Sequence, residues 1–355
     1  RVFALVRSNT PGGGGTGIPG DGHSIMLASQ AGAFKDIVSN NLLGDAVANV
    51  TESADITDPV LLSVNIHYGY GLVTFTFSET IDVTPKALVN TSLIQFSNNS
   101  NDSIVPFGNP SSHPLVNYRE GLVTIESDTD VKSPVIRLFE YVRTVIIAYS
   151  GVKGGDGDNA YMLVQAGAFI DLAGNFNAKD ASLKASENPD DVGPTFKNGV
   201  INYGTGVFIL EAHKTMDLTP ATTKVVFSDL FFADGETDIA GVNLTGAEIV
   251  ELDGLFMTLF LTEEQLIGAH NISNTPGAGY SGSTGDGTSV FFGLGAGSIQ
   301  DTATNLANQT SGIPVTEIPD TIPPLILSAL IDYSTGSLFI ANNETIDCTP
   351  TELVI

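Results

Sequence analysis

The sequence predicts an all-β protein built from tandem antiparallel β-sandwich domains, arranged as beads on a string with at most short helical turns. Three observations predict this class. Short stretches of alternating apolar and polar residues recur and are separated by turns rich in Gly, Ser, Thr and Asn. Trp is absent, and Lys and Arg together number 14 of 355 residues. One phrase is written three times, so a single structural unit is reused.

The repeated phrase sets the period of the chain. It reads SETIDVTP at residues 78–85, HKTMDLTP at 213–220 and NETIDCTP at 343–350. The position numbers of its aspartates, Asp82, Asp217 and Asp347, differ by 135 (217 − 82) and then by 130 (347 − 217). A solenoid with one strand per turn would need a far shorter period. We therefore expect separate sandwich domains in series.

This period divides the chain into four parts. We predict the C-terminal half of a repeat at residues 1–54, complete repeats at 55–189 and 190–319, and the N-terminal part of a further repeat at 320–355. The half-repeats indicate either a slice of a longer array or a subunit whose two halves meet head to tail. Joining the halves would leave about forty-five residues of a repeat missing, which favours the slice.

Within a repeat, each element has its own local signal. Residues 61–67 and 72–77 alternate as two strands around a Gly-containing turn, and residues 207–211 follow the equivalent turn in the next repeat. Residues 262–265 read Thr-Glu-Glu-Gln, a capping box that predicts a single helical turn. Ser133 and Pro134 indicate the start of a short helix. Further strands are expected at residues 93–96, 116–118, 122–126, 144–149 and 161–164.

The charge pattern limits the partners of this protein. Forty acidic and 14 basic residues give a formal charge of −26, which disfavours nucleic acid and anionic membranes as partners and favours divalent cations, basic surfaces or solvation. Charged residues make up only 15% of the chain and hydrophobic residues 42%, so the chain is expected to fold. No apolar run approaches the ~20 residues of a membrane span. The single cysteine, Cys348, cannot form an intrachain disulfide.

The order of the motifs resembles a known kind of repeat. A Pro-x-Leu segment, a hairpin, the SETID phrase and the DLAGN phrase at Asp171–Asn175 are similar to the bacterial Ig-like repeats of S-layer and swimming (SwmB-type) proteins. Similar arrays occur in large surface proteins of algae and protists. The resemblance implies Ig-like sandwiches in an extracellular or cell-surface array with a structural or adhesive role.

In an Ig-like repeat, the key phrase and the DLAGN loop both return to the pole at which the chain enters. We therefore expect carboxylates to gather there as Ca²⁺ ligands, because Ca²⁺ takes six to eight oxygens. The alternative is that these aspartates only cap turns. In the second repeat Lys214 replaces Glu79, and its ammonium is an alternative to an ion. The candidates are Asp55, Asp58, Glu79, Asp82 and Asp171 in the first complete repeat, and Asp190, Asp191, Asp217 and Asp301 in the second.

A second aspartate motif, Gly-Asp-Gly, centres on Asp21, Asp156 and Asp286. Each of these residues precedes a loop aspartate by fifteen positions (36 − 21, 171 − 156, 301 − 286). An intervening strand of about nine residues separates the two aspartates by roughly 30 Å, too far to share an ion. We therefore interpret this motif as a tight turn in which Gly adopts positive φ.

Catalysis is not expected. The five histidines share no metal-ligand spacing, and the chain has no nucleophile motif and no phosphate-binding loop. N-glycosylation sequons favour a secreted chain. They occur at Asn49, Asn90, Asn98, Asn101, Asn243, Asn271, Asn308 and Asn343.

The predicted function is that of a structural subunit in an extracellular filament, sheath or surface layer, with further repeats of its own kind as partners. The alternative is a calcium-stiffened adhesin that binds glycans or a protein through its loops. A secreted hydrolase carrying these repeats as accessory modules would need its catalytic domain elsewhere. No cofactor other than Ca²⁺ is expected.

Overall fold

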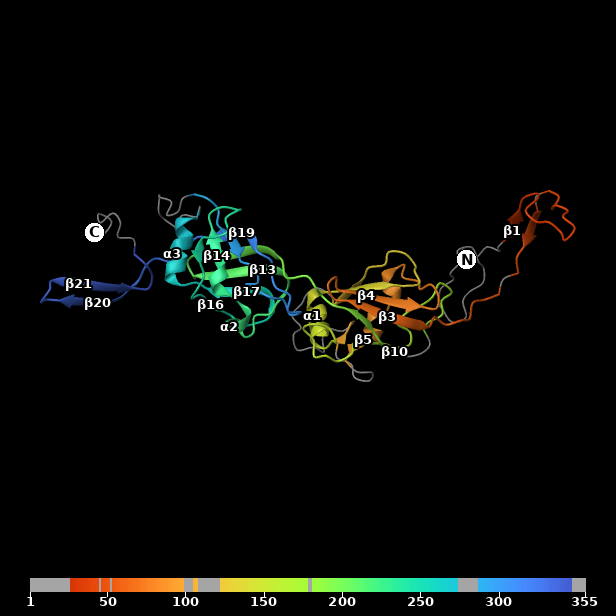
Figure 1. Ribbon diagram of the computed structural model, residues 1–355, viewed down its shortest axis with the longest axis horizontal. Helices are drawn as coiled ribbons and strands as arrows, with labels where there is room; N and C mark the ends of the chain where they lie inside the picture. Colours follow the sequence, from red (N-terminus) through yellow and green to blue (C-terminus); the bar gives the residue numbers. More distant parts are fainter. Residues whose placement is uncertain are drawn as a thin grey trace. The chain divides into compact units, whose positions relative to one another are not determined.

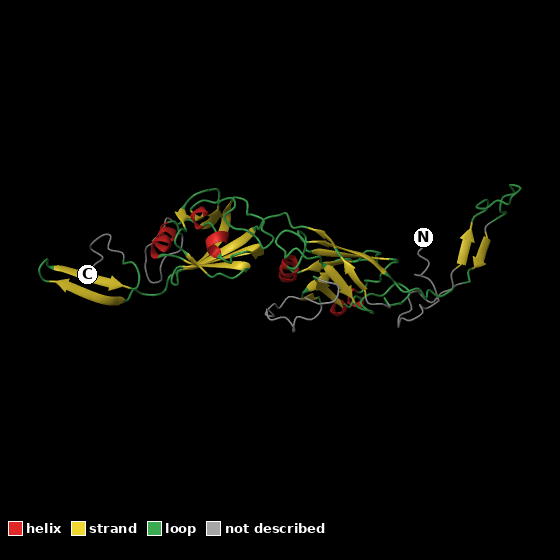
Figure 2. Cartoon of the chain, turned by 60° about the horizontal axis from the view of Figure 1, so that its bottom comes forward, coloured by secondary structure: helices red, strands yellow, loops and turns green. Residues whose placement is uncertain are grey.

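The computed structural model describes residues 26–44, 46–51, 53–98, 105–107, 122–177, 181–273 and 287–346. Strands make up 40% and helices 11% of the structure, which confirms the all-β class (Figures 1 and 2). The chain divides into two compact units, Arg1–Asp190 and Asp191–Ile355. In the described part of the chain, no helix is long and apolar enough to cross a membrane. The finer division into four repeats stays a prediction.

The first unit contains two sheets. One has the strand order β11-β3-β4-β8-β7, with β11 parallel to β3 and the other pairs antiparallel. The other has the order β10-β9-β5-β6 and is antiparallel throughout. The strands are β3 (Leu61–His67), β4 (Leu72–Phe77), β5 (Ile94–Ser97), β6 (Val105–Pro106), β7 (Val123–Ile125), β8 (Val135–Leu138), β9 (Tyr161–Val164), β10 (Ala181–Lys184) and β11 (Ser186–Asn188).

The alternating apolar side chains of β4 form part of the core of the first unit, as the sequence predicts. Val73, Phe75 and Phe77 alternate along β4 and are fully buried. The rings of Phe75 and Phe77 lie 5.4 and 4.7 Å from that of Phe169 in the turn after β9. Gly71 closes the β3–β4 hairpin at φ +63°, a conformation that favours glycine.

A helix replaces one predicted strand of the first unit. Residues 144–149 were expected to be extended, but α1 (Glu140–Ala148) covers most of them. Val142, Ile146 and Ile147 are buried, so the apolar residues follow helical spacing and bury one face. The short helix expected to start at Ser133 and Pro134 is also wrong, because the residues that follow form strand β8 and the helix begins only at Glu140. Two short 3-10 helices, η2 (Lys86–Leu88) and η3 (Thr91–Leu93), follow the key phrase.

The second unit contains one curled eight-stranded sheet where separate sheets were expected. Its order is β15-β14-β18-β19-β12-β13-β17-β16. The reason is β19, which pairs antiparallel with β18 in its first half and parallel with β12 through Val315–Ile318. The strands are β12 (Phe196–Asn202), β13 (Val207–Met216), β14 (Leu230–Ala233), β15 (Val242–Asn243), β16 (Glu248–Ile249), β17 (Gly254–Phe260), β18 (Phe291–Leu294) and β19 (Thr310–Ile318).

The core and the helices of the second unit follow local sequence signals. Phe208, Phe232 and Phe292 form an aromatic cluster with centroid distances of 4.9, 5.1 and 6.1 Å. The predicted capping box is present: the Thr262 side chain accepts from the Gln265 amide, and the Gln265 side chain accepts from the Thr262 amide. The helix it starts, α3 (Glu263–Asn271), is nine residues long and exceeds the predicted single turn. Shorter helices are α2 (Ala221–Lys224) and η5 (Phe227–Asp229).

Two further hairpin-like pairs form sheets of their own. β1 (Met26–Ser29) pairs antiparallel with β2 (Ala46–Asn49), within the residues predicted to be a closing half-repeat. β20 (Ile326–Asp332) pairs antiparallel with β21 (Ser337–Asn342), within the residues predicted to open a further repeat. The third copy of the key aspartate, Asp347, and Cys348 lie outside the described residues.

Candidate metal centre

The candidate centre combines three segments of the first unit. Asp55 lies in the extended chain before β3, Glu79 follows β4, and Asp171 lies in the turn after β9. The end of β4 meets this turn because Ile81 forms an antiparallel bridge with Asp171 and the Asp82 amide donates to the Ile170 carbonyl at 2.8 Å. The fold therefore brings together carboxylates that lie far apart in the sequence.

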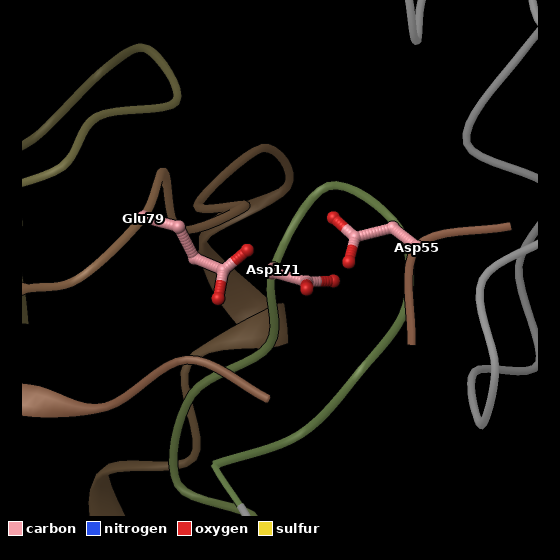
Figure 3. A group of neighbouring side chains, drawn as sticks. All are labelled: Asp55, Glu79 and Asp171. Carbon is pink, nitrogen blue, oxygen red and sulfur yellow. The ribbon is translucent and has the colours of Figure 1, made fainter. Parts of the chain in front are cut away.

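The three carboxylates form a compact group. Asp55, Glu79 and Asp171 each offer an oxygen, and these oxygens lie within 4.8 Å of one another. Figure 3 shows the side chains pointing toward one another from their separate segments. Asp171 is buried, whereas Asp55 and Glu79 are half-buried. Among the described residues, this is the one such group of at least three His, Cys, Asp or Glu side chains.

The Asp171 turn is held by its own hydrogen bonds. Asp171 Oδ1 accepts from the amides of Ala173 and Asn175, each at 2.8 Å, and Gly174 adopts φ +86°. Asn175 Nδ2 donates to Asp171 Oδ2 at 3.0 Å and to the Asp55 carbonyl at 3.1 Å. Asp171 thus caps a turn, as the alternative interpretation expected, and it also faces two further carboxylates. Asn175, which connects two of the three segments, was not predicted as a site residue.

Burial and like charge both act on this group. Burial raises the pKa of Asp171, and the nearby charge of Asp55 raises it further. The pKa of Asp82 is also raised, first by burial and then by the charges of Asp130 and Asp171. The site therefore favours either protonated carboxyls or a bound cation.

Two predicted ligands of the first repeat lie outside the group of three. Asp58 is exposed. Asp82 lies beside Asp130, and its Oδ1 accepts from the Thr84 amide at 3.1 Å.

Asp130 was missed by the sequence analysis, although its Oδ1 accepts from the Val83 amide at 3.0 Å and from Thr84 Oγ1 at 2.7 Å. A second repeated spacing in the sequence, of 123 positions, could have identified Asp130. The position numbers of Asp253 and Asp130 differ by 123 (253 − 130), as do those of the first residues of α3 and α1 (263 − 140). Asp253 accepts from the Leu218 amide at 2.7 Å in the same way.

In the second unit, lysines face the corresponding aspartates. Met216 bridges to Asp301, as Ile81 does to Asp171, and the Asp301 side chain is completely buried. Lys214, which occupies the position of Glu79, places Nζ 3.9 Å from Asp301 Oδ2 and donates to the Val192 carbonyl. Asp217 Oδ2 lies 2.7 Å from Lys224 Nζ. The Lys214 ammonium therefore lies beside Asp301, as expected in the alternative to a bound ion.

The remaining predicted ligands do not complete a carboxylate cluster. Asp190 belongs to the first unit, where its fully buried carboxylate lies 2.7 Å from Arg143 Nη1. Asp191 is exposed. The second repeat therefore has no group of three such ligands among the described residues.

The glycine-aspartate motif behaves as a turn where the structure describes it. Gly157 adopts φ +92°, and Asp156 Oδ1 accepts from the Asp158 amide at 2.9 Å. Asp21 and Asp286 lie outside the described residues.

The sequon asparagines differ in exposure. Asn98 is half-buried, and Asn101 lies outside the described residues. Asn243 is exposed, but its Nδ2, the atom that would carry a glycan, donates to the Ser228 carbonyl at 2.6 Å. The other exposed sequon asparagines are Asn49, Asn90, Asn271, Asn308 and Asn343.

Comparison with known proteins gives no family for this chain: no protein-family model matches it, and no curated protein matches it.

Proposed function

We propose that this chain is a structural segment of an extracellular filament, sheath or surface layer built from tandem Ig-like repeats. The observation that carries the proposal is a junction built in the same way in both units. The Asp82 amide donates to the Ile170 carbonyl at 2.8 Å, and the Asp217 amide donates to the Gln300 carbonyl at 3.0 Å. Reuse of one unit at a fixed step is the basis of extended arrays.

The strand order supports the Ig-like part of the proposal. An Ig-like sandwich has one sheet in the order A-B-E-D and another with strands C, F and G. In the first unit, β3-β4-β8-β7 and β5-β9-β10 follow these two orders. The second unit has the same neighbours, with β19 joining its two halves into one sheet.

Charge and sequons support the extracellular part. A net charge of −26 keeps copies of such a chain soluble and disfavours polyanionic partners inside the cell. Exposed sequons suit a chain that passes through the secretory pathway. The proposed role is non-catalytic, and its partners are further repeats of the same kind.

Electron microscopy with an antibody against this chain tests the proposal on cells that produce it. We expect label on external filaments, a sheath or a surface layer. Label confined to the cytoplasm would contradict the proposed location. Soluble secreted antigen with no ordered structure would contradict the structural role.

The group formed by Asp55, Glu79 and Asp171 favours a second candidate, a calcium-stiffened adhesin. Three carboxylates supply up to six oxygens, and Ca²⁺ accepts six to eight. Burial, and then the charge of Asp55, raise the pKa of Asp171, and a Ca²⁺ ion would favour the ionised carboxylates against both. Because Lys214 already supplies positive charge beside Asp301, the second unit needs no ion there.

Glycan binding separates the adhesin from the structural candidate. The full chain would be applied to a glycan array with Ca²⁺ and again with EDTA. Calcium-dependent binding to a defined glycan supports the adhesin. Calcium-dependent stability without glycan or protein binding supports a stiffened structural segment.

A further inference from the structure

The sheet of the second unit exposes apolar side chains on its outer face. β13, β17 and β16 are neighbours in this sheet, as Figure 1 shows. Alternate residues of β17 enter the core, so Phe256 and Phe260 point away from it and are 54% and 47% exposed. On β13, Ile209 is 37% exposed and pairs with Thr258, which lies between the two phenylalanines. These side chains therefore share one face of the sheet.

The same face continues onto the strands on both sides. Val250 follows β16, is 43% exposed and donates its amide hydrogen to the Thr258 carbonyl. Ile318 on β19 is 42% exposed and pairs with Asn202 on β12, which pairs in turn with Val207 on β13. We call this surface the outer apolar face of the second unit. It consists of Val207, Ile209, Val250, Phe256, Phe260 and Ile318.

The corresponding face of the first unit is polar. Its strands β4 and β8 take the places of β13 and β17, because Arg137 pairs with β4 as Phe260 pairs with β13. Thr74 corresponds to Ile209 at the step of 135 (209 − 74), and Arg137 corresponds to Phe260 at the step of 123 (260 − 137). The same sheet therefore forms with threonine and arginine at these positions. Because the fold does not require apolar residues there, their exposure in the second unit indicates a partner that covers them.

Charge and chemistry make a second copy the partner that this face fits. The chain carries a formal charge of −26, so copies repel one another over most of their surface. On the outer face, however, Glu211 is paired with Lys197 at 2.6 Å, and Glu248 lies at the edge, opposite Phe260. Among the described residues, the centre of the face therefore presents apolar side chains and no carboxylate to a basic partner. It offers a glycan the hydroxyl of Thr258, whereas ligand sites use several convergent polar groups.

The size of the face suits a weak dimer. Five neighbouring strands form it, from β19 through β12, β13 and β17 to β16. At about 4.8 Å per strand and 3.4 Å per residue, five strands over the length of Val207–Glu211 span about 24 by 17 Å, or about 400 Å². With the relief of the side chains, two such faces bury about 1,000 Å², near the lower limit for a specific interface. Two sheets that pack face to face lie about 10 Å apart.

We propose that the second units of two copies pair through the outer apolar face about a two-fold axis. Such a contact is isologous, so each face supplies the surface that covers the other. Ile209, Phe256 and Phe260 form its apolar centre, and the ion pair of Lys197 and Glu211 borders it. This inference rests on the proposed array function and names a lateral contact within it. Because a two-fold contact closes on itself, it joins two arrays side by side and does not lengthen either one.

Sedimentation equilibrium of the full chain tests the contact. Over about 1–500 µM, we expect the average mass to rise from that of one chain to that of two and then to level off, as a weak closed dimer requires. Phe260→Arg and Ile209→Thr introduce the residues that the first unit carries at these positions. Each should raise the dimer dissociation constant by at least about tenfold, since each change occurs twice in a two-fold interface.

Ile239→Arg is the matched control, since Ile239 is exposed in the same unit but lies in the loop before β15. It should leave the dissociation constant unchanged, and calorimetry should show a folded second unit in all three variants. A chain that stays monomeric at every concentration overturns the inference, as does a dimer that persists unchanged in both Phe260→Arg and Ile209→Thr. Binding of a monomeric chain to phosphatidylcholine vesicles, lost in Phe260→Arg, would also overturn it and assign the face to lipid. Each of these outcomes leaves the array proposal intact, whereas cytoplasmic antibody label overturns the array function alone.

Discussion

The buried ion pair between Arg143 and Asp190 should control the stability of the first unit. Arg143 Nη1 lies 2.7 Å from Asp190 Oδ2, and Nη2 lies 2.5 Å from Glu140 Oε1. Nη1 also donates to the Tyr68 carbonyl at 3.2 Å. The Arg143 and Asp190 side chains are 4% and 0% exposed. Arg143→Met keeps most of the apolar stem but leaves the buried carboxylate without its guanidinium partner.

The expected cost follows from burial. Removing one partner of a buried ion pair costs about 3–5 kcal/mol, because the remaining charge stays desolvated. An exposed pair is worth about 0–1 kcal/mol. Arg137 and Glu126 form such a pair at 2.7 Å, with side chains 44% and 36% exposed, so Arg137→Met is the matched control. For a unit of this size, each kcal/mol corresponds to about 2–4 °C in the unfolding midpoint.

Differential scanning calorimetry of the full chain measures both variants. Arg143→Met should lower the midpoint of the first unit by about 6–20 °C, and Arg137→Met by no more than about 4 °C. Adding Asp190→Leu to Arg143→Met should recover part of the loss, because the buried charge is then removed as well. A midpoint shift for Arg143→Met no larger than that for Arg137→Met would refute the reasoning.

Three further predictions concern the carboxylate sites. At constant ionic strength, Ca²⁺ at about 100 times its Kd should stabilise the first unit by about 2.7 kcal/mol. Calorimetry should show this gain in Asp58→Asn but little of it in Glu79→Gln; an EDTA-insensitive midpoint in the parent chain would exclude the ion. Lys214→Met should lower the midpoint of the second unit by about 4–8 °C, because Asp301 loses its ammonium and a loss of about 2 kcal/mol follows; an unchanged midpoint would show that Lys214 does not support Asp301. Because the pKa of Asp171 is raised in the folded state, its contribution to stability is full below the ordinary value of 3.8 and is lost as pH rises through the folded-state pKa. Without Ca²⁺, the first unit should therefore gain stability as pH falls from neutral toward about 4, and Asp171→Asn should reduce that gain in pH-dependent calorimetry; an identical pH profile for both would contradict this assignment.

The predictions from the sequence agree best with the structure where a single sequence pattern decides the element or contact. Alternation alone predicted β3 and β4, since every second side chain enters the core. The expected Ig-like strand order predicted that Glu79 and Asp171 meet, because it returns the key phrase and the loop at Asp171 to the same pole of the repeat. The capping box predicted the start of α3 to the residue, because its two hydrogen bonds are local.

Tertiary contacts decide the features that the sequence did not predict. Residues 144–148 are β-branched or small and read as a strand, but Val142 completes a helical apolar face that packs into the core. The two sheets join through β19 at Pro314, which is the last residue paired with β18 before β12 takes over at Val315. Proline has no amide hydrogen to donate and is accommodated at this change of partner strand. The local sequence does not predict the change.

The position of Asp190 shows the limit of counting repeats. It lies in the acidic segment that enters the second repeat, 135 positions after Asp55 (190 − 55), and was expected to be a metal ligand of that repeat. Its partner is instead Arg143 on α1, and the equivalent position of α3, at the step of 123 (266 − 143), is Leu266. The charge that faces Asp190 thus comes from helix α1, which lies outside the repeated phrase.

The residue at the second position of the key phrase determines what balances the neighbouring aspartate. It is Glu79, then Lys214, then Glu344. Lys214 neutralises Asp301 directly, whereas Glu79 adds a third carboxylate to its group. At Glu344, burial raises the pKa, and the charges of Asp320 and Glu263 raise it further. In the two compact units, where the bridge of Ile81 to Asp171 matches that of Met216 to Asp301, this one position separates a site that carries its own cation from a site whose carboxylates need a proton or an added ion.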